Sequence, residues 1–284
     1  MAPRIQNGHL SVEVKPFGAT LTSVRSEKTG REFLWQGNPE IWNGQSPILF
    51  PIIGRLLEDT CFIDGRPYSI IRHGLARHRA FELAGQTETS VAFLQESDAE
   101  TRKSYPFDYR LLVRFALSGN RLTVTHTVEN PNDREMYFSI GAHPAFNCAL
   151  GDRLSFEVPE TLDSLRIDAN SLLTDRRDRI LTNSRTLPLT AHLFDRDALI
   201  FEGVQSKFVT LQRQDGVQIR FHFGDAPYLA VWAKPAAPFV CLEPWYGVND
   251  GYAPVADFSE KRGIVKLPAV ETFAFSWDAA FTEG

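Results

Sequence analysis

A glutamate near the C-terminus has the surroundings expected of a general base. Glu243 follows the apolar run F-V-C-L and precedes Pro244, Trp245 and Tyr246. Desolvation raises the pKa of a carboxylate that emerges from a buried strand beside aromatic rings, which suits a base working near neutral pH. Trp245 and Tyr246 also offer flat surfaces for the apolar face of a sugar. In this segment taken alone, a structural glutamate paired with a nearby arginine is an equally good interpretation.

Two of the seven histidines lie in settings that favour a functional role. His143 stands in S-I-G-A-H-P-A-F, where Pro144 restricts the backbone to an extended form and places the imidazole on a rigid rim. His73 stands in R-H-G-L-A-R, where Gly74 permits a tight turn or the close approach of a ligand. The alternative for each is an incidental loop histidine. His126 alternates with apolar residues, which predicts a core histidine with a hydrogen-bond partner.

Arginines gather near His73 in the sequence, at Arg55, Arg72, Arg77 and Arg79. Arg55 ends the apolar run S-P-I-L-F-P-I-I-G, and an arginine delivered by a buried strand usually has a carboxylate or a polar ligand as its partner. The chain contains no dinucleotide-binding or P-loop motif, no H-E-x-x-H motif and no G-x-S-x-G motif. Its three cysteines are widely spaced, without the pattern of a zinc site or a disulfide framework. We therefore expect neither a metal nor a cofactor.

Strands are the elements expected to position these residues. Alternation of apolar and polar side chains is clearest at 121–129 and 217–223, and Asp215-Gly216 and Asp64-Gly65 predict hairpin turns. Short helices are expected only near 38–43 and 191–194, and βαβ alternation and repeats are absent. The chain is therefore predicted to be all-β, a large antiparallel β-sandwich with few short helices, in one domain over residues 1–284. Further strands are expected at 10–14, 20–25, 80–84, 90–95, 109–117, 136–141, 154–158, 199–202, 228–232, 239–242 and 271–277.

Composition excludes several classes of function. The 284 residues carry 30 basic and 35 acidic side chains, a net charge of −5, which argues against a nucleic-acid-binding protein. No run approaches the 18 apolar residues of a membrane span, and the N-terminus lacks the apolar segment of a signal peptide. We expect a cytoplasmic protein with neither a membrane nor a nucleic-acid partner. The sequence leaves monomer and homodimer open.

Six segments, taken in order along the chain, resemble the aldose 1-epimerase (galactose mutarotase-like) family, and most closely its bacterial branch with an H-G-[FL]-A-R motif. They are residues 17–23, 46–55, 73–77, 141–146, 193–199 and 241–247. The resemblance implies a large antiparallel β-sandwich with an open sugar cleft. It also implies interconversion of the α and β anomers of a small-molecule sugar, without metal or cofactor.

The resemblance implies particular catalytic roles. Glu243 matches the family's general base, and His143 matches its general acid. Glu243 would take the proton of the C1 hydroxyl while His143 protonates the ring oxygen. The ring would open to the aldehyde, rotate about C1–C2 and close on the other face.

Five further residues are expected to bind the sugar. Arg55 and His73 match the family's sugar-holding arginine and earlier histidine, and Asp197 in L-F-D-R-D-A-L is the candidate for an aspartate that orients the sugar. Arg77 belongs to the H-G-L-A-R motif, and Trp245 offers an aromatic platform. The galactose mutarotases have Gly-Gly after the first histidine, whereas this chain has Gly-Leu-Ala-Arg, so the preferred sugar stays open.

Two alternative functions remain. A hexose-6-phosphate 1-epimerase would use the basic cluster of Arg72, Arg77 and Arg79 to hold a phosphate. Against it, residues 42–46 read W-N-G-Q-S, where an R-G-G run is expected in that branch. A non-catalytic carbohydrate-binding or sensor protein would keep only the cleft, and the presence of both candidate catalytic residues argues against it.

Overall fold

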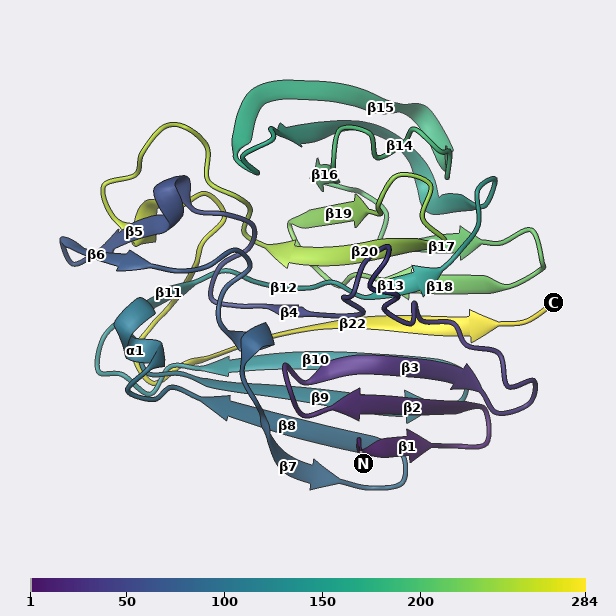
Figure 1. Cartoon of the computed structure of the whole chain (residues 1–284), viewed down its shortest axis with the longest axis horizontal. Helices are drawn as coiled ribbons and strands as arrows, with labels where there is room; N and C mark the ends of the chain where they lie inside the picture. The colour runs from purple at the N-terminus through teal and green to yellow at the C-terminus, as the bar shows by residue number, and fades with distance from the viewer. Residues whose placement is uncertain (1) are drawn as a thin grey trace.

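Antiparallel strands make up nearly all the regular structure in the computed structural model, which describes residues 2–284 (Figure 1). The largest sheet has 15 strands, and smaller sheets of three, two and two strands pack around it. The predicted all-β class and large antiparallel β-sandwich are therefore confirmed. The single domain expected for residues 1–284 stays a prediction.

The main sheet follows the order β4-β12-β20-β19-β16-β14-β17-β18-β22-β10-β9-β8-β7, with β13 added to β20 and β15 added to β14. Its strands are β4 (Ile48–Leu49), β7 (Glu82–Gln86), β8 (Ser90–Glu96), β9 (Arg110–Ser118), β10 (Arg121–Glu129), β12 (Ile140–Ala142), β13 (Ala145–Asn147), β14 (Arg153–Ile167), β15 (Leu173–Pro188), β16 (Leu199–Glu202), β17 (Phe208–Gln212), β18 (Gln218–His222), β19 (Tyr228–Trp232), β20 (Phe239–Tyr246) and β22 (Thr272–Thr282).

Three smaller sheets and a few helical turns complete the described chain. They are β1 (Arg4–Gln6), β2 (Leu10–Lys15) and β3 (Thr20–Ser26) in one sheet, β5 (Thr60–Ile63) with β6 (Arg66–Ser69), and β11 (Met136–Phe138) with β21 (Val265–Leu267). Helical turns are α1 (Thr101–Ser104) and the 3₁₀ turns Leu57–Asp59, Ala76–His78 and Phe258–Glu260. No helix in residues 2–284 is long and apolar enough to cross a membrane.

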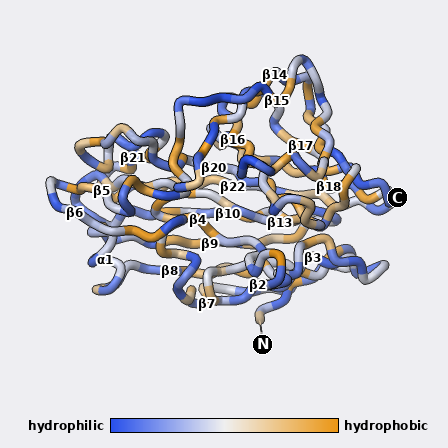
Figure 2. The backbone as a smooth tube through the Cα atoms, turned by 45° about the horizontal axis from the view of Figure 1, so that its top comes forward, coloured by the Kyte–Doolittle hydropathy of each residue, from blue (hydrophilic) through white to orange (hydrophobic). Residues whose placement is uncertain are grey.

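Strand β10 illustrates why these residues form a sheet. Its side chains alternate between buried and partly exposed positions, with Leu122, Val124, His126 and Val128 buried, as the sequence predicts. The strand pairs in register with β9 on one side and β22 on the other. The same alternation of hydrophobic and hydrophilic residues runs along many strands of the backbone tube (Figure 2).

His126 is buried as expected, but a ring stack replaces the expected hydrogen bond at one of its nitrogens. Its imidazole lies flat against Phe275, with ring centroids 4.6 Å apart and 7° between the planes. The Nδ1 atom is enclosed and has no hydrogen-bond partner among residues 2–284. Burial lowers the pKa of His126 to about 3, so the ring is neutral at physiological pH.

Both predicted hairpins are confirmed. Asp64 and Gly65 have φ values of 53° and 72° and join β5 to β6, as a type I′ turn requires. Asp215 and Gly216 lie in the turn between β17 and β18.

Three local predictions are wrong. Residues 38–43 and 191–194 form turns without a helix. The strand expected at 136–141 divides into β11 and β12, which belong to different sheets. The sequence analysis also missed β15, which pairs only with β14. Charged residues occupy both faces of this strand, so apolar alternation is hidden.

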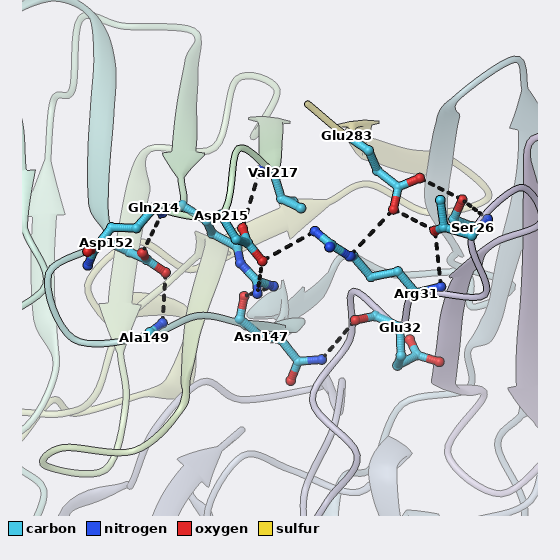
Figure 3. Close-up of polar contacts among 12 residues, drawn as sticks. Ser26, Arg31, Glu32, Asn147, Ala149, Asp152, Gln214, Asp215, Val217 and Glu283 are labelled. Atoms are coloured by element: carbon cyan, nitrogen blue, oxygen red, sulfur yellow. Dashed lines mark hydrogen bonds and ion pairs between the residues drawn. The ribbon is translucent and has the colours of Figure 1, made fainter.

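Polar contacts link the segment after β3 to the β17–β18 turn and to the tail after β22 (Figure 3). Arg31 lies between two carboxylates, with Nη1 3.2 Å from Asp215 and Nε 3.5 Å from Glu283. Glu283 also accepts a hydrogen bond from Ser26 at 2.8 Å. The segment after β3 is thereby joined to the tail after β22.

The three cysteines are buried free thiols in separate parts of the fold. Cys61 lies in β5, Cys148 follows β13, and Cys241 lies in β20. Burial raises the pKa of Cys61 and of Cys148 to about 12, and it raises that of Cys241 strongly as well.

Candidate active site

A cavity of about 420 Å³ brings together six of the seven residues expected from the sequence to form the site. Strand β20 contributes two of them, the ends of β12, β14 and β19 lie beside it, and the turn after β6 closes one side. The cavity is lined by Trp42, Arg72, His73, Arg77, His78, His143, Ile167, Asp197, Ala198, Trp232, Lys234, Glu243, Trp245 and Asn249.

The two candidate catalytic groups lie against each other on the floor of this cavity. His143 Nε2 is 3.3 Å from Glu243 Oε1, and the Glu243 side chain is only 1% exposed. Trp245, two residues further along β20, donates a hydrogen bond from Nε1 to Glu243 Oε2 at 3.1 Å. The carboxyl group is therefore held at both oxygens, one facing the imidazole and the other facing the indole.

Burial shifts the pKa values of Glu243 and His143 in opposite directions. Desolvation raises the pKa of Glu243 well above its ordinary value, Asp197 raises it further, and the Trp245 hydrogen bond opposes the rise. Desolvation lowers the pKa of His143 to about 3, helped by the positive charge of Arg77. At a pH above the lowered pKa of His143 and below the raised pKa of Glu243, the pair carries one proton. The carboxyl group holds this proton, and the imidazole beside it is neutral.

Aromatic rings fix the orientation of His143. Trp42 stacks on the imidazole at a centroid distance of 5.2 Å and an angle of 26°. Trp232 meets it edge-on at 5.7 Å and 78°. Sequence reasoning missed both tryptophans, because they come from a loop and from the end of β19, far from His143 in the chain. Neither tryptophan stands in a pattern that points to the site, since β19 is apolar and buried along most of its length.

The position of His73 depends on a tight backbone turn. His73 has a φ of 63° and Gly74 a φ of 80°. A Cβ atom on Gly74 would lie 2.1 Å from the carbonyl oxygen of Phe50, so only glycine fits there. The sequence-based interpretation of Gly74 as a residue at a tight turn is therefore confirmed.

A hydrogen-bond donor approaches each ring nitrogen of His73. The backbone N–H of Gly54 donates to Nδ1 at 3.1 Å, and Arg72 Nε donates to Nε2 at 3.3 Å. A neutral imidazole has one acceptor nitrogen and one N–H group, so each tautomer of the ring satisfies only one of these donors. Burial and the neighbouring Arg72 lower the pKa of His73.

Arg55 is the one expected site residue that the structure does not bring to the cavity. Its guanidinium donates two hydrogen bonds of 2.7 Å to the carboxylate of Asp59, four residues further on. A third runs to the carbonyl oxygen of Asn170. The structure therefore does not support the expected role of Arg55 in sugar binding. Its guanidinium already donates to the carboxylate of Asp59 and to the carbonyl oxygen of Asn170.

Arg72 and Arg77 line the cavity instead of Arg55. Arg72 donates from Nη1 to Ser171 Oγ at 2.8 Å. Neither arginine forms an ion pair within the part of the chain that the structure describes. Arg79, the third member of the sequence-derived basic cluster, pairs with Asp98. The cluster is therefore divided, with two of its arginines facing the candidate site.

Asp197, Asn249 and Lys234 complete the polar lining. Asp197 has a φ of 67° and accepts a hydrogen bond from the following backbone N–H at 2.7 Å. Asn249 is buried, and its Nδ2 donates to the carbonyl oxygen of Ser171. Sequence reasoning identified Asp197 through the family resemblance but missed Asn249 and Lys234, which stand in no recognisable motif.

Two lining residues and a buried cysteine behind them have the composition of a metal site. Nitrogen, sulfur and oxygen atoms of His143, Cys241 and Glu243 lie within 4.8 Å of one another. Burial raises the pKa of the Cys241 thiol strongly, however, and a metal would need the thiolate. The donor set therefore fits a metal poorly at neutral pH. The expectation of no metal and no cofactor stays a prediction.

Comparison with known proteins identifies the family. The family model described as "Aldose 1-epimerase" matches residues 2–264. The chain belongs to the aldose 1-epimerase family. The resemblance seen in the sequence is thereby confirmed at the level of the family, and the narrower H-G-[FL]-A-R branch stays a prediction.

Relatives of this aldose 1-epimerase family member match along nearly its whole length. Protein LacX of Lactococcus lactis, in its chromosomal form, is 34% identical, with 98% of each chain covered. A solved structure of a galactose mutarotase related enzyme from Lactobacillus acidophilus is 31% identical, with a TM-score of 0.95 and coverage of 100% and 98%. A galactose mutarotase-like protein from Lactobacillus casei is 29% identical, with a TM-score of 0.94 and coverage of 99% and 100%.

Proposed function

We propose that the protein is a cofactor-independent isomerase that interconverts the α and β anomers of a free aldohexose. The observation that carries the proposal is the contact between His143 Nε2 and Glu243 Oε1, 3.3 Å apart on the floor of the cavity. Membership of the aldose 1-epimerase family supports an isomerase. The proposal adds the pair that carries out the reaction and the free sugar as its substrate.

Anomer exchange needs one base and one acid. The base takes the proton of the C1 hydroxyl as the bond from C1 to the ring oxygen breaks, and the acid protonates the ring oxygen. The open aldehyde rotates about C1–C2, and the two proton transfers then run in reverse on the other face. The enzyme ends in its initial protonation state, so a pair holding a single proton is sufficient.

Glu243 serves as the base and His143 as the acid. Before a sugar binds, the shared proton lies on Glu243, and its transfer across the 3.3 Å contact produces the carboxylate and imidazolium that begin ring opening. The N–H of Trp245 stabilises that carboxylate. A positioned acid or base of this kind contributes roughly 10²–10⁴-fold to the rate.

The remaining lining holds the sugar in place. The rings of Trp42, Trp232 and Trp245 offer apolar surfaces, and the guanidinium groups of Arg72 and Arg77 offer donors to hydroxyl oxygens. A donor left buried without an acceptor costs roughly 1–3 kcal/mol. A sugar whose hydroxyls match these donors is therefore preferred.

Polarimetry of freshly dissolved α-D-glucose and α-D-galactose tests the proposal. Wild-type protein is expected to accelerate the approach to anomeric equilibrium, and Glu243→Gln to lose at least about 10²-fold in kcat because the base is removed. Glu271→Gln, a change of the same type at an exposed position, is the matched control. A folded Glu243→Gln variant with wild-type turnover would contradict the assignment of the base.

A hexose 6-phosphate is the second candidate substrate. Arg72 and Arg77 line the cavity without an ion-pair partner among residues 2–284, and guanidinium groups bind phosphate well. Relaxation of glucose 6-phosphate, followed by NMR beside glucose, distinguishes the candidates. A kcat/KM for the phosphate ester at least about tenfold above that for glucose would favour this alternative.

A further inference from the structure

We propose that Ser171, which does not line the catalytic cavity, is a positioning residue that holds the guanidinium of Arg72 at the cavity wall. This inference rests on the proposed function, in which Arg72 offers donors to sugar hydroxyls. It names the residue that keeps those donors in one place. Ser171 belongs to the turn at 168–172, which joins β14 to β15, and it reaches Arg72 from outside the set of lining residues.

Arg72 is a side chain that needs an anchor. It is exposed, although it lines the cavity, and a long side chain of this kind has several rotatable bonds. Fixing such a side chain when a ligand binds costs affinity. Ser171 Oγ accepts a hydrogen bond from Arg72 Nη1 at 2.8 Å and uses only one of the five guanidinium N–H groups. The others stay available to a sugar, and the side chain is already ordered.

His73 is a less dependable partner for Arg72. Its Nε2 lies 3.3 Å from Arg72 Nε, but its Nδ1 lies 3.1 Å from the backbone N–H of Gly54, and a neutral ring has a single acceptor nitrogen. Gly54 is buried, so an unpaired N–H there is costly, whereas the exposed Arg72 can turn to water. The tautomer that accepts from Gly54 offers no acceptor to Arg72. The hydroxyl of Ser171 then remains as the anchor.

Ser171 is itself held by its backbone. Its N–H donates to the carbonyl oxygen of Asp168 at 2.9 Å, and its carbonyl oxygen accepts from Asn249 Nδ2 at 2.7 Å. The amide of Asn249 packs closely on Gly54, where an added Cβ would lie 2.1 Å from Asn249 Cγ. Ser171 and Asn249 are 8% and 3% exposed. The hydroxyl that meets Arg72 therefore projects from a fixed part of the fold.

The rest of the turn is tied to the segment before β5. Arg55 Nη1 donates to the carbonyl oxygen of Asn170 at 3.3 Å. The backbone N–H of Asp250 donates to the carbonyl oxygen of Arg55 at 2.9 Å, and the N–H of Leu173 donates to the carbonyl oxygen of Asp250 at 2.7 Å. Arg55 thus helps to hold the turn that anchors Arg72, although it does not reach the cavity itself.

The backbone conformation of Ser171 gives its hydroxyl added weight. Its φ is 61°, in the left-handed region where glycine costs least. A serine at this position gives up backbone stability that a glycine would provide, and in exchange it supplies the acceptor for Arg72. Ser171→Gly therefore removes the hydroxyl and keeps both a comfortable backbone and the carbonyl oxygen that accepts from Asn249.

Steady-state polarimetry of Ser171→Gly, with the sugar that the wild type relaxes fastest, tests the proposal. We expect KM to rise about fivefold and kcat to stay within about twofold, because an unanchored Arg72 must be ordered by the sugar while the acid–base pair is untouched. Ser118→Gly, a change of the same type at an exposed position of β9, is the matched control. An unchanged KM in Ser171→Gly would overturn the inference.

A double-mutant cycle distinguishes positioning from a general structural role. Arg72→Met removes the guanidinium and keeps most of the apolar stem. If Ser171 acts through Arg72, Ser171→Gly changes KM by less than about twofold in the Arg72→Met background. A rise of about fivefold in both backgrounds would mean that Ser171 supports the cavity independently of Arg72, and it would overturn the inference.

A measurement on Arg72 itself separates this inference from the proposed function. The order parameter of its Nε–H group, from ¹⁵N relaxation without sugar and with the signal assigned through Arg72→Met, is expected to fall below about 0.6 in Ser171→Gly from about 0.8 in the wild type. That fall would support the anchor even if no sugar were relaxed, in which case the proposed function alone fails. Equal order parameters in the two proteins would overturn the anchor.

Discussion

The carboxyl group of Glu243 and the imidazole of His143 owe their opposite pKa shifts to the same loss of water. Burial disfavours the charged form of each group, so the pair holds its proton as a neutral acid beside a neutral base. In the proposed reaction, the hydroxyl dipoles of a bound sugar favour the charged pair over the neutral one. The Glu243 carboxylate and the His143 imidazolium are therefore needed only while a substrate is bound.

The pH profile of kcat/KM follows from these directions. Protonation of His143 would add a second proton to the pair and leave no base. Because burial lowers the pKa of His143 to about 3, the acidic limb is expected well below pH 6.5. Stopped-flow polarimetry from pH 4 to pH 9, corrected for the uncatalysed rate, measures it. An acidic limb at pH 6.5 would show that His143 keeps the pKa of a solvated imidazole.

Trp245 has an effect on Glu243 that can be measured separately. Its N–H donates to Glu243 Oε2 and opposes the rise in the pKa of that carboxyl. Trp245→Phe keeps a ring but removes the donor, so the pKa of Glu243 is expected to rise and the alkaline limb of kcat/KM to move to higher pH. A neutral hydrogen bond of this kind contributes about 1 kcal/mol, which predicts a loss of roughly fivefold in kcat. An alkaline limb that stays in place would contradict this role.

Individual residues differed in how well the sequence predicted them. Glu243 and His143 were candidates because each precedes a proline after a largely apolar run, and their catalytic roles came from the family resemblance. Arg55 also follows an apolar run, yet its guanidinium pairs with Asp59 across a turn that no local sequence pattern predicts. Trp42 and Trp232 reach His143 from distant segments, and their packing depends on the complete fold.

At the scale of one strand, the histidine in the middle of β10 makes the fold sensitive to acid. Burial lowers the pKa of His126 to about 3 in the folded protein. Below pH 6.5 this histidine is therefore protonated in the unfolded chain but stays neutral in the native state. Stability from this group is intact above pH 6.5 and is lost as the pH falls toward 3. Between pH 7 and pH 5 the loss is roughly 2 kcal/mol.

His126→Phe removes this sensitivity while keeping a flat ring against Phe275. The free energy of unfolding is therefore expected to fall by roughly 2 kcal/mol less in the variant than in the wild type between pH 7 and pH 5. Urea titrations at the two pH values measure the difference. The other buried histidines cancel in this comparison, and equal falls in the two proteins would contradict the prediction.

Strands were predictable from the sequence where one face is buried and the other is more exposed, as in β8, β9 and β10. In such strands apolar and polar residues alternate along the sequence, and this pattern predicts a strand. Strand β15 shows no such alternation. It pairs only with β14, at the edge of the sheet, and it carries arginines and aspartates along much of its length. Edge strands are often charged, which protects them from pairing with other chains, and that charge hides them from pattern analysis.

At the scale of the whole molecule, the contacts of Arg31 join the segment after β3 to the β17–β18 turn and to the tail after β22. The groups are partly exposed, with 38% of the Arg31 side chain, 40% of Asp215 and 21% of Glu283 accessible. Solvent screens such pairs, so Arg31→Gln is expected to lower the free energy of unfolding by no more than about 1 kcal/mol. Chemical denaturation measures it. A larger loss would mean that these contacts act as a cooperative network.

The three buried thiols can report how often different parts of the folded protein open locally. Cys61, Cys148 and Cys241 lie in β5, after β13 and in β20, and a thiol reagent reaches each of them only when its surroundings open. Labelling rates followed by mass spectrometry would rank the three regions by how often they fluctuate. Cys241 lies beside the candidate catalytic pair, so a sugar in the cavity should slow its labelling more than that of Cys61.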